Sequence, residues 1–305
     1  MTTQTVSPSK RKLWLAAIKP PMYSVAVIPI WVGTAVAIAQ TQWLDRLTFS
    51  IFLASAILII AWLNLSNDVF DADTGIDVNK PHSVVNLTGN KTLVFWVANL
   101  CLILAIAGLG AIAWWQGDLT VTAIVLACCA LGYTYQGPPF RLGYQGLGEP
   151  ICFVTFGPMA IAAAYYSQTQ AWSFAKLDDV ASLAIASILV GITTSIILFC
   201  SHFHQVADDI AAGKRSPIVR LGTARGAKLL SSSCASVYVL TAVGVGLGWL
   251  PLATLSIFLS LPLAIDLCRH VNTNHDRPER VSNCKFIAVS LHFWSGLLLG
   301  LGLIV

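Results

Sequence analysis

The sequence predicts an all-α integral membrane protein with nine transmembrane helices in one bundle. Three observations predict this class: hydrophobic residues make up 56% of the chain, charged residues make up only 10%, and the mean hydropathy is +0.73. Mostly apolar runs of roughly 17–25 residues are long enough to cross a bilayer. Because lipid offers the backbone no hydrogen-bond partners, such runs are expected to be helices. We expect one transmembrane domain over residues 1–305, with residues 1–14 as a short cytoplasmic tail.

The apolar runs are taken in chain order. The first follows the basic segment KRKLW, as a cleaved signal peptide would, but it continues into a full-length span without a small-residue cleavage pattern, so we expect it to be retained. The second, FSIFLASAILIIAWLNL, is too long and too apolar for a surface helix. The eighth apolar run contains Pro262 and Asp266. The remaining runs are assigned as spans because they have the same length and apolarity. The predicted spans are 22–40, 48–66, 93–115, 118–135, 150–167, 179–201, 229–247, 250–268 and 286–304.

The basic residues predict how the bundle is oriented. Nine spans divide the loops into two sets, and one set carries 16 of the 18 Lys and Arg residues, leaving only Arg46 and Lys176 on the other side. Basic residues concentrate in cytoplasmic loops. The basic set of loops holds the N-terminus, 67–92, 136–149, 202–228 and 269–285. We expect these loops to face the cytoplasm or stroma, from a bacterial inner membrane or a thylakoid. The net charge of +4 reflects this asymmetry and does not predict nucleic-acid binding, and no protein partner is inferred.

An acidic cluster follows the second span on the basic side, in the stretch NLSNDVFDADTGIDVNK, residues 64–80. Asn64, Asn67, Asp68 and Asp71 are spaced i, i+3, i+4 and i+7, which places them on one helix face. Asp73 lies off that face and is expected to be ordinary surface. The cluster therefore predicts four oxygen-bearing side chains directed into one space at the membrane surface.

A second cluster follows the sixth span and suggests that the second half repeats the first. At an offset of 138 positions, Asn64 matches His202, Asn67 matches Gln205, Asp71 matches Asp209 and Gly75 matches Gly213. On a continuing helix, His202, Gln205 and Asp209 would share one face, and Asp208 would lie about 100° to the side of Asp209. The chain is thus expected to form two pseudo-repeated halves whose acidic helix ends face each other.

Gathered carboxylates repel one another unless a cation lies among them. Oxygen ligands suit Mg²⁺, which is typically held by one or two carboxylates together with substrate phosphates. The predicted metal ligands are Asn67, Asp68, Asp71, Asp208 and Asp209. Basic residues beside both clusters suit the oxygens of a diphosphate. The predicted diphosphate-binding residues are Asn64, Asn67, Lys80, Lys91, Gln205, Lys214 and Arg215.

A diphosphate site at a bilayer surface, walled by apolar helices, favours a lipid-tailed diphosphate with its tail in the bundle. Ionisation of an allylic C–O bond would need stabilisation of the leaving group, aromatic faces and exclusion of water. The third cytoplasmic segment, GYTYQGPPFRLGYQGLGEP, offers Tyr133 and Arg141 for this purpose, although its tyrosines equally suit an interfacial aromatic belt. The predicted catalytic residues are Asp68, Asp71, Asp209, Tyr133 and Arg141.

From about residue 15 to 304 the chain resembles the UbiA-type intramembrane prenyltransferases. That family has nine transmembrane helices and two Asp-rich motifs, and it transfers a prenyl group from a Mg²⁺-bound diphosphate to an acceptor that is often aromatic. The first motif, N-D-x-x-D-x-x-x-D, is matched by Asn67, Asp68 and Asp71, whereas Gly75 replaces the last Asp and Asp77 follows it.

These departures resemble one branch of the family, the 1,4-dihydroxy-2-naphthoate prenyltransferases. The segments NDVFDADTGID and GKRSPIVRLG are similar to that branch, and HFHQVADDIAAGKRSPIVRLGT is similar to its cyanobacterial phytyltransferase form. The resemblance implies Mg²⁺-dependent transfer of a prenyl group, phytyl in that form, to 1,4-dihydroxy-2-naphthoate. Diphosphate and CO₂ would be released, and the product would serve phylloquinone or menaquinone biosynthesis.

The second motif departs from the family's usual D-x-x-x-D, because Gln205 stands where the first Asp is expected. Two interpretations remain open: Asp208 supplies the missing charge, or the second cluster acts mainly through Asp209. The acceptor also has alternatives within the family, homogentisate or a chlorophyllide. A divalent-cation transporter is the alternative from another class, but it would carry ionisable positions near mid-bilayer rather than at the span ends.

Overall fold

The structure is a computed structural model that describes residues 10–18, 20–74, 83–172 and 177–305, and within these ranges it is helical without a strand. The first half contains α1 (Lys10–Ile18), η1 (Pro20–Tyr23), α2 (Ser24–Thr41), α3 (Arg46–Thr74), α4 (Val84–Thr88), α5 (Lys91–Gln116), α6 (Thr120–Gln136) and η2 (Leu142–Gln145). The second half contains α7 (Gly148–Val154), η3 (Thr155–Met159), α8 (Ala160–Thr169), α9 (Leu177–His202), α10 (Val206–Ala211), α11 (Pro217–Leu221), α12 (Thr223–Gly246), η4 (Leu252–Ser260), α13 (Leu261–Asn274), α14 (Pro278–Val281) and α15 (Cys284–Ile304).

The predicted all-α membrane architecture is confirmed. Eight of the nine predicted spans lie in helical segments that are long and apolar enough to cross a bilayer. The remaining one, α6, is apolar but has only 17 residues, so the predicted count of nine full-length spans is one too many by this measure. At 1.5 Å per residue α6 is about 26 Å long, slightly less than a typical hydrocarbon core. In addition, α1 begins at Lys10, so residues 10–14 of the expected tail are helical.

The boundaries of the spans follow from local chemistry. Pro20 and Pro21 form the 3₁₀ turn η1, after which α2 begins at Ser24. The side chain of Asn90 caps α5 by accepting a hydrogen bond from the Leu93 amide at 2.9 Å. Gly117 ends the same helix in the left-handed conformation that glycine adopts without a steric penalty.

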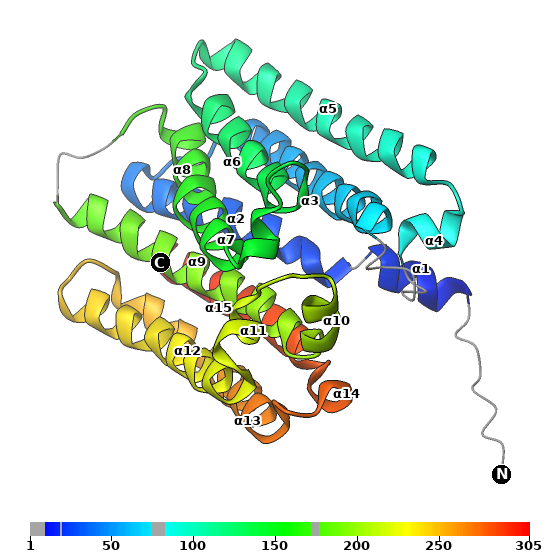
Figure 1. Ribbon diagram of the computed structural model, residues 1–305. Helices are drawn as coiled ribbons and strands as arrows, with labels where there is room; N and C mark the ends of the chain where they lie inside the picture. The colour runs from blue at the N-terminus through cyan, green and yellow to red at the C-terminus, as the bar shows by residue number, and fades with distance from the viewer. Residues whose placement is uncertain (1–9, 19, 75–82, 173–176) are drawn as a thin grey trace.

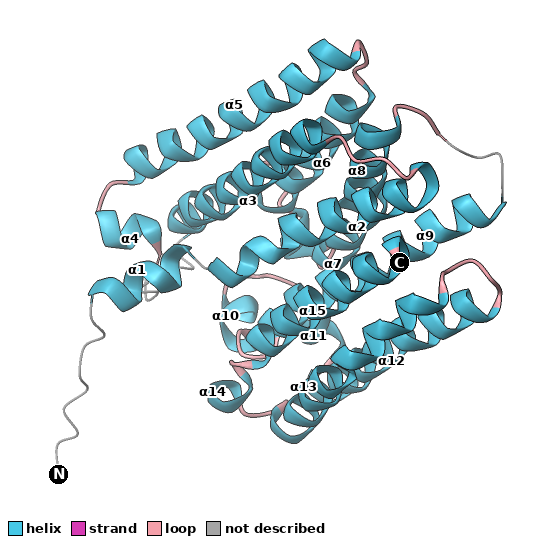
Figure 2. Ribbon diagram, turned by 180° about the vertical axis from the view of Figure 1, so that it is seen from behind, coloured by secondary structure: helices cyan, strands magenta, loops and turns pink. Residues whose placement is uncertain are grey.

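Helix α2 lies at the centre of the bundle, where it packs against α15, α8, α3 and α9. Helix α5 lies along the outside, mainly against α3 (Figures 1 and 2). Its outer face exposes Trp96, Ile103, Leu104 and Trp114, which would be unfavourable in water but suits contact with lipid. The pattern of burial therefore agrees with a bundle whose apolar perimeter faces the membrane.

The span that contains α7 and α8 is irregular where it borders the interior. Helices α7 and α8 are joined by the π-helical turn η3, which contains Pro158. Gly157 in this turn packs closely on α9, because a Cβ there would lie 2.5 Å from the Ser187 carbonyl oxygen. A π turn accommodates the proline, which cannot donate a backbone hydrogen bond, and such turns often occur at functional sites.

The short helices α1, α4, α10 and α14 gather at one end of the bundle in both views (Figures 1 and 2). Helix α3 reaches this end with its acidic cluster, as predicted. The predicted helix face of the second cluster is wrong. Helix α9 ends at His202, residues 203–205 form a turn, and Asp208 and Asp209 lie on the separate helix α10. Polar residues follow His202, and Gly213 has a positive φ of 69°. Both features favour turns over a continued span.

Candidate active site

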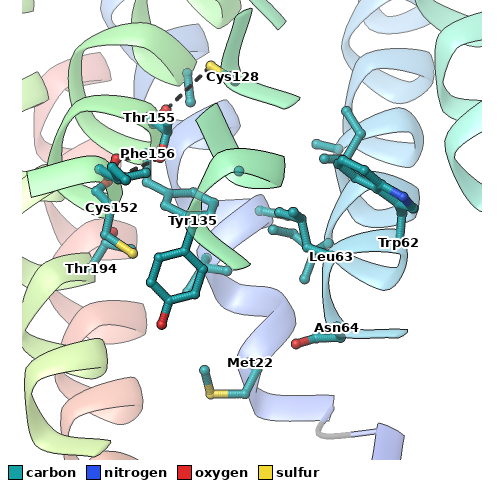
Figure 3. A pocket seen from close by; sticks show the side chains of 18 of the residues that line it. Met22, Trp62, Leu63, Asn64, Cys128, Tyr135, Cys152, Thr155, Phe156 and Thr194 are labelled. Atoms are coloured by element: carbon teal, nitrogen blue, oxygen red, sulfur yellow. Dashed lines mark hydrogen bonds between the residues drawn. The ribbon is translucent and has the colours of Figure 1, made fainter. Parts of the chain in front are cut away.

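A cavity of about 280 Å³ opens inside the bundle between α2, α3, α6, the α7–η3 segment and α9. Asn64 on α3 and Tyr135 on α6 face it from opposite sides (Figure 3). Its polar end is lined by Asn64, Asn67, Gln136, Ser201 and Lys285, and its walls by apolar and aromatic side chains that include Ile30, Phe52, Ile59, Leu63, Phe70, Val125, Tyr133 and Phe156. A polar head and an apolar tail would therefore both find matching surroundings in this cavity.

The cavity is elongated along α3. Its lining on this helix extends from Phe52 to Phe70, which corresponds to about 27 Å at 1.5 Å per residue. Phe70 and Tyr133 pack edge to face at its polar end, with ring centroids 6.0 Å apart. Both rings line the cavity, and an aromatic face attracts positive charge on a neighbouring atom.

The first acidic cluster lies at the polar end and is buried. Asp68 is 1% exposed, and its Oδ2 accepts a hydrogen bond of 2.8 Å from the Val84 amide of α4. Asp71 is 7% exposed and accepts a hydrogen bond from Nε2 of Gln136 on α6. Among the described residues, Oδ1 of Asn67 is buried without a hydrogen-bond partner. An amide oxygen in this position is available to a ligand, since a buried polar atom is normally satisfied.

The second cluster is also buried, through Asp209 rather than Asp208. Asp208 is exposed, whereas Oδ2 of Asp209 lies 3.0 Å from His202 Nδ1 and Oδ1 lies 3.3 Å from Lys214 Nζ. Burial alone would raise the pKa of Asp209, but the hydrogen bond from His202 and the charge of Lys214 outweigh it and hold this pKa below its ordinary value. Asp209 is therefore an ionised carboxylate at neutral pH.

Both acidic clusters lie near Tyr135 of α6. Asp71 and Asp209, together with Glu149, interact electrostatically with the buried phenol of Tyr135 on α6. The cavity is lined by Asn64 and Asn67 of α3 and by Leu198 and Ser201 near the end of α9. The prediction that the ends of the second and sixth spans face one space therefore agrees with the packing, although only the first cluster lies on a continuous helix.

Several predicted site residues lie elsewhere. Lys91 forms an exposed ion pair with Asp73, so it is engaged outside the cavity. Arg215 lines a separate surface hollow with Tyr144 and Arg220. Arg141 does not line the cavity. Gln205 is half-buried between α9 and α10. Lys80 and Asp77 fall outside the described residues. Tyr133 lines the cavity as predicted and donates a hydrogen bond of 2.9 Å to the Pro138 carbonyl.

The structure also brings in residues that the sequence analysis did not assign. Glu149 on α7 lies 3.5 Å from His202, and Gln136 holds Asp71. Lys285 at the start of α15 is the single Lys or Arg among the described residues that line the cavity. Each of these contacts joins segments distant in sequence, so no local spacing marks it. The one sequence signal is their position on the basic side of the predicted topology.

The donor set fits Mg²⁺ shared with a substrate. Within the described residues, no group of three or more His, Cys, Asp and Glu side chains is preformed as a metal cage. The oxygens that could bind a cation are the amide of Asn67 and the carboxylates of Asp68, Asp71 and Asp209. Mg²⁺ retains several of its water ligands, so proteins usually bind it through a few carboxylates together with substrate phosphates.

Comparison with known proteins identifies the family. The model of the UbiA prenyltransferase family matches residues 26–296. The chain belongs to the UbiA prenyltransferase family. It is 60% identical over 299 residues to the 2-carboxy-1,4-naphthoquinone phytyltransferase of Synechocystis sp., an alignment that covers 98% of this chain and 95% of the relative. It is 43% identical to the chloroplastic 2-carboxy-1,4-naphthoquinone phytyltransferase of Arabidopsis thaliana, with 98% and 78% covered.

The fold is also similar to that of a known UbiA homolog. The structure of a UbiA homolog from Archaeoglobus fulgidus, bound to GPP and Mg²⁺, superimposes with a TM-score of 0.59 at 16% identity and covers 94% of this chain and 99% of that one. At this level of identity the similarity supports a shared fold. The UbiA family member described here is thus a multi-pass membrane enzyme of the prenyltransferase class, and the resemblance seen in the sequence is confirmed. The interpretation as a cation transporter is set aside.

Proposed function

We propose that this enzyme transfers a phytyl group from phytyl diphosphate to 1,4-dihydroxy-2-naphthoate, with release of diphosphate and CO₂, in phylloquinone or menaquinone biosynthesis. The observation that carries the proposal is the cavity, whose largely apolar lining runs for about 27 Å along α3 and includes Asn64 and Asn67 of the first cluster at its polar end. The names of the two relatives described above support phytyl as the prenyl group and a naphthoquinoid ring as the acceptor.

The donor would lie with its tail along α3 and its diphosphate at the polar end. Mg²⁺ bound there would neutralise the diphosphate as it leaves. Asn67, Asp68 and Asp71 from α3 and Asp209 from α10 would hold the metal–diphosphate complex, and Asn64 and Lys214 would contact it as donors. The walls exclude water from the allylic carbon, and Phe70 and Tyr133 offer aromatic faces to the charge that develops on it.

The acceptor must be an electron-rich ring, because its carbon attacks an electrophilic prenyl carbon. A dihydroxynaphthoate satisfies this requirement, whereas the corresponding quinone is electron-poor. The C–C bond would form at the ring carbon that bears the carboxylate, and the bond to the carboxylate would then break to release CO₂. The electron pair of that bond restores the aromatic ring, so no base is required to remove a proton from the carbon.

The acidic clusters are assigned to the cytoplasmic side of the membrane. The short helices and the segments that carry most of the Lys and Arg residues lie at the same end of the bundle as these clusters, and such residues are concentrated on the cytoplasmic face. A water-soluble acceptor and a lipid-tailed donor could both reach the site from that interface.

The experiment uses the purified full-length protein in detergent with a panel of prenyl diphosphates and acceptors. We expect phytyl diphosphate with 1,4-dihydroxy-2-naphthoate to give the prenylated product in the presence of Mg²⁺ and no product in excess EDTA. Equal turnover with homogentisate would contradict the assigned acceptor. Full turnover in EDTA would contradict the metal requirement.

A further inference from the structure

Four titratable side chains form a continuous, largely buried chain beside the cavity. Oε1 of Glu149 lies 3.5 Å from His202 Nε2, His202 Nδ1 lies 3.0 Å from Oδ2 of Asp209, and Oδ1 of Asp209 lies 3.3 Å from Lys214 Nζ. The side chains of His202 and Asp209 are only 3% and 2% exposed, and those of Glu149 and Lys214 are 13% and 14% exposed. These four side chains connect α7, the end of α9, α10 and the segment that follows α10.

Stability alone does not account for Glu149. Among the described residues, neither of its carboxylate oxygens accepts a hydrogen bond, although both are buried. A buried ion pair is weak evidence for stabilisation, because desolvation offsets most of the Coulomb energy unless additional hydrogen bonds are made. The placement of Glu149 against the outer nitrogen of His202 therefore points to a role at the site.

We propose that Glu149 and His202 are positioning residues that fix the carboxylate of Asp209 toward the Mg²⁺–diphosphate complex. They provide the support that the second motif lacks at Gln205, where the family usually has a carboxylate. The inference rests on the proposed function, because it assumes that Asp209 faces a metal-bound diphosphate.

The geometry explains how the pair acts. A carboxylate oxygen accepts hydrogen bonds, so Nδ1 of His202 donates to Oδ2 of Asp209. Nε2 on the other side of the ring faces Glu149, which fixes the ring orientation. A carboxylate has about four lone-pair positions, so Asp209 retains acceptor capacity after its contacts with His202 and Lys214. Such outer partners of ligands typically contribute about 10–100-fold in metal affinity or activity.

The test measures binding separately from turnover. A non-reactive prenyl thiolodiphosphate is added to the full-length protein, and the Mg²⁺ concentration that gives half-maximal thermal stabilisation is determined. Glu149→Gln keeps the size of the side chain but replaces the carboxyl group by an amide. We expect this variant to require about 10-fold more Mg²⁺. The kcat should fall, whereas KM for the acceptor should be unchanged. Glu149→Asp, which retains a carboxylate, should recover part of the loss.

Two further variants separate positioning from general damage. Ser195→Ala removes the hydrogen bond from Ser195 Oγ to the backbone carbonyl of Glu149, at 3.1 Å, and leaves the carboxylate in place, so its Mg²⁺ requirement should be that of the unaltered protein. Because Glu149 and His202 act as a unit, Glu149→Gln combined with His202→Gln should be no worse than the more severe single variant.

Two outcomes would overturn the inference. If Glu149→Gln bound the thiolodiphosphate with an unaltered Mg²⁺ requirement, the positioning role would be wrong and the proposed function would stand. If the unaltered protein showed no Mg²⁺-dependent stabilisation, the metal assignment in the proposed function would fail, and this inference would fail with it.

Discussion

Asp208 and Asp209 are adjacent in the chain but differ sharply in environment. Asp209 is 1% exposed and contacts His202 and Lys214, whereas Asp208 is exposed on the outer side of α10. Of the two interpretations of the second motif, this geometry favours the one in which the cluster acts mainly through Asp209. A short helix turns consecutive residues about 100° apart, so only one of them faces the interior.

This difference gives a prediction for the two carboxylates. Asp209→Asn removes a proposed ligand, so it should lower kcat at least about 100-fold, which is the most that losing only an outer partner of a ligand typically costs. Asp208→Asn should remain within about 2-fold of the unaltered enzyme, as expected for a surface substitution away from special features. Both variants are compared by steady-state kinetics and by thermal unfolding without ligand. A larger loss for Asp208→Asn would restore the interpretation in which Asp208 supplies the missing charge.

At the level of helices, the bundle depends on close approach at glycine positions. On α2, a Cβ at Gly33 would lie 2.6 Å from the Ile161 carbonyl oxygen and 2.7 Å from the Ala164 Cβ of α8. On α5, a Cβ at Gly110 would meet nothing within 4 Å. Small residues allow membrane helices to pack closely, and α2 and α8 use this freedom next to the cavity.

The matched substitutions should therefore differ. Gly33→Ala should destabilise the fold by about 1–3 kcal/mol, the usual cost of overpacking, because rigid backbone and a helix neighbour must move. Gly110→Ala should be neutral or slightly stabilising, since alanine favours helix by about 1 kcal/mol over glycine. Thermal unfolding in detergent measures both. Equal midpoints for the two variants would show that the α2–α8 contact is looser than the structure indicates.

The helices also show which features of the fold could be predicted from the sequence. Long apolar runs specify helices because lipid leaves the backbone no alternative, and each predicted span from 22–40 to 286–304 corresponds to a helical segment. Their ends differ by up to eight residues, because helices such as α3, predicted to end at residue 66, continue to Thr74 beyond the apolar run. The i, i+3, i+4, i+7 spacing of α3 was also informative, because that helix continues through Asp71. The similar spacing after His202 was not, since Asp209 reaches His202 across a turn.

The interior contacts of the site could not be predicted because they depend on tertiary packing. Glu149 meets His202, Gln136 meets Asp71 and Lys285 reaches the cavity only when distant spans pack together. A single polar residue at the end of an apolar run carries no signal about its partner. Conversely, Lys91 and Arg215 stand beside acidic residues in the sequence but lie outside the cavity in the fold.

For the whole molecule, the shape of the cavity should limit the length of the donor. Val125 on α6 is buried and lines the apolar end, away from the acidic clusters. Val125→Phe should fill part of that end, so kcat/KM for phytyl diphosphate should fall about 10-fold, as a hydrophobic pocket responds to one or two misfitting groups. The much shorter geranyl diphosphate should be less affected. Val239→Phe, on the exposed face of α12, is the control and should leave both values unchanged.

The central claim is that the bundle couples prenyl transfer to loss of the acceptor's carboxylate. The most direct measurement uses 1,4-dihydroxy-2-naphthoate labelled in its carboxylate, with phytyl diphosphate and Mg²⁺, and compares released CO₂ with prenylated product. We predict that the two appear in equal amounts, and that neither appears without the prenyl diphosphate. Prenylated product that retains the labelled carboxylate, or CO₂ released in the absence of the donor, would contradict the account.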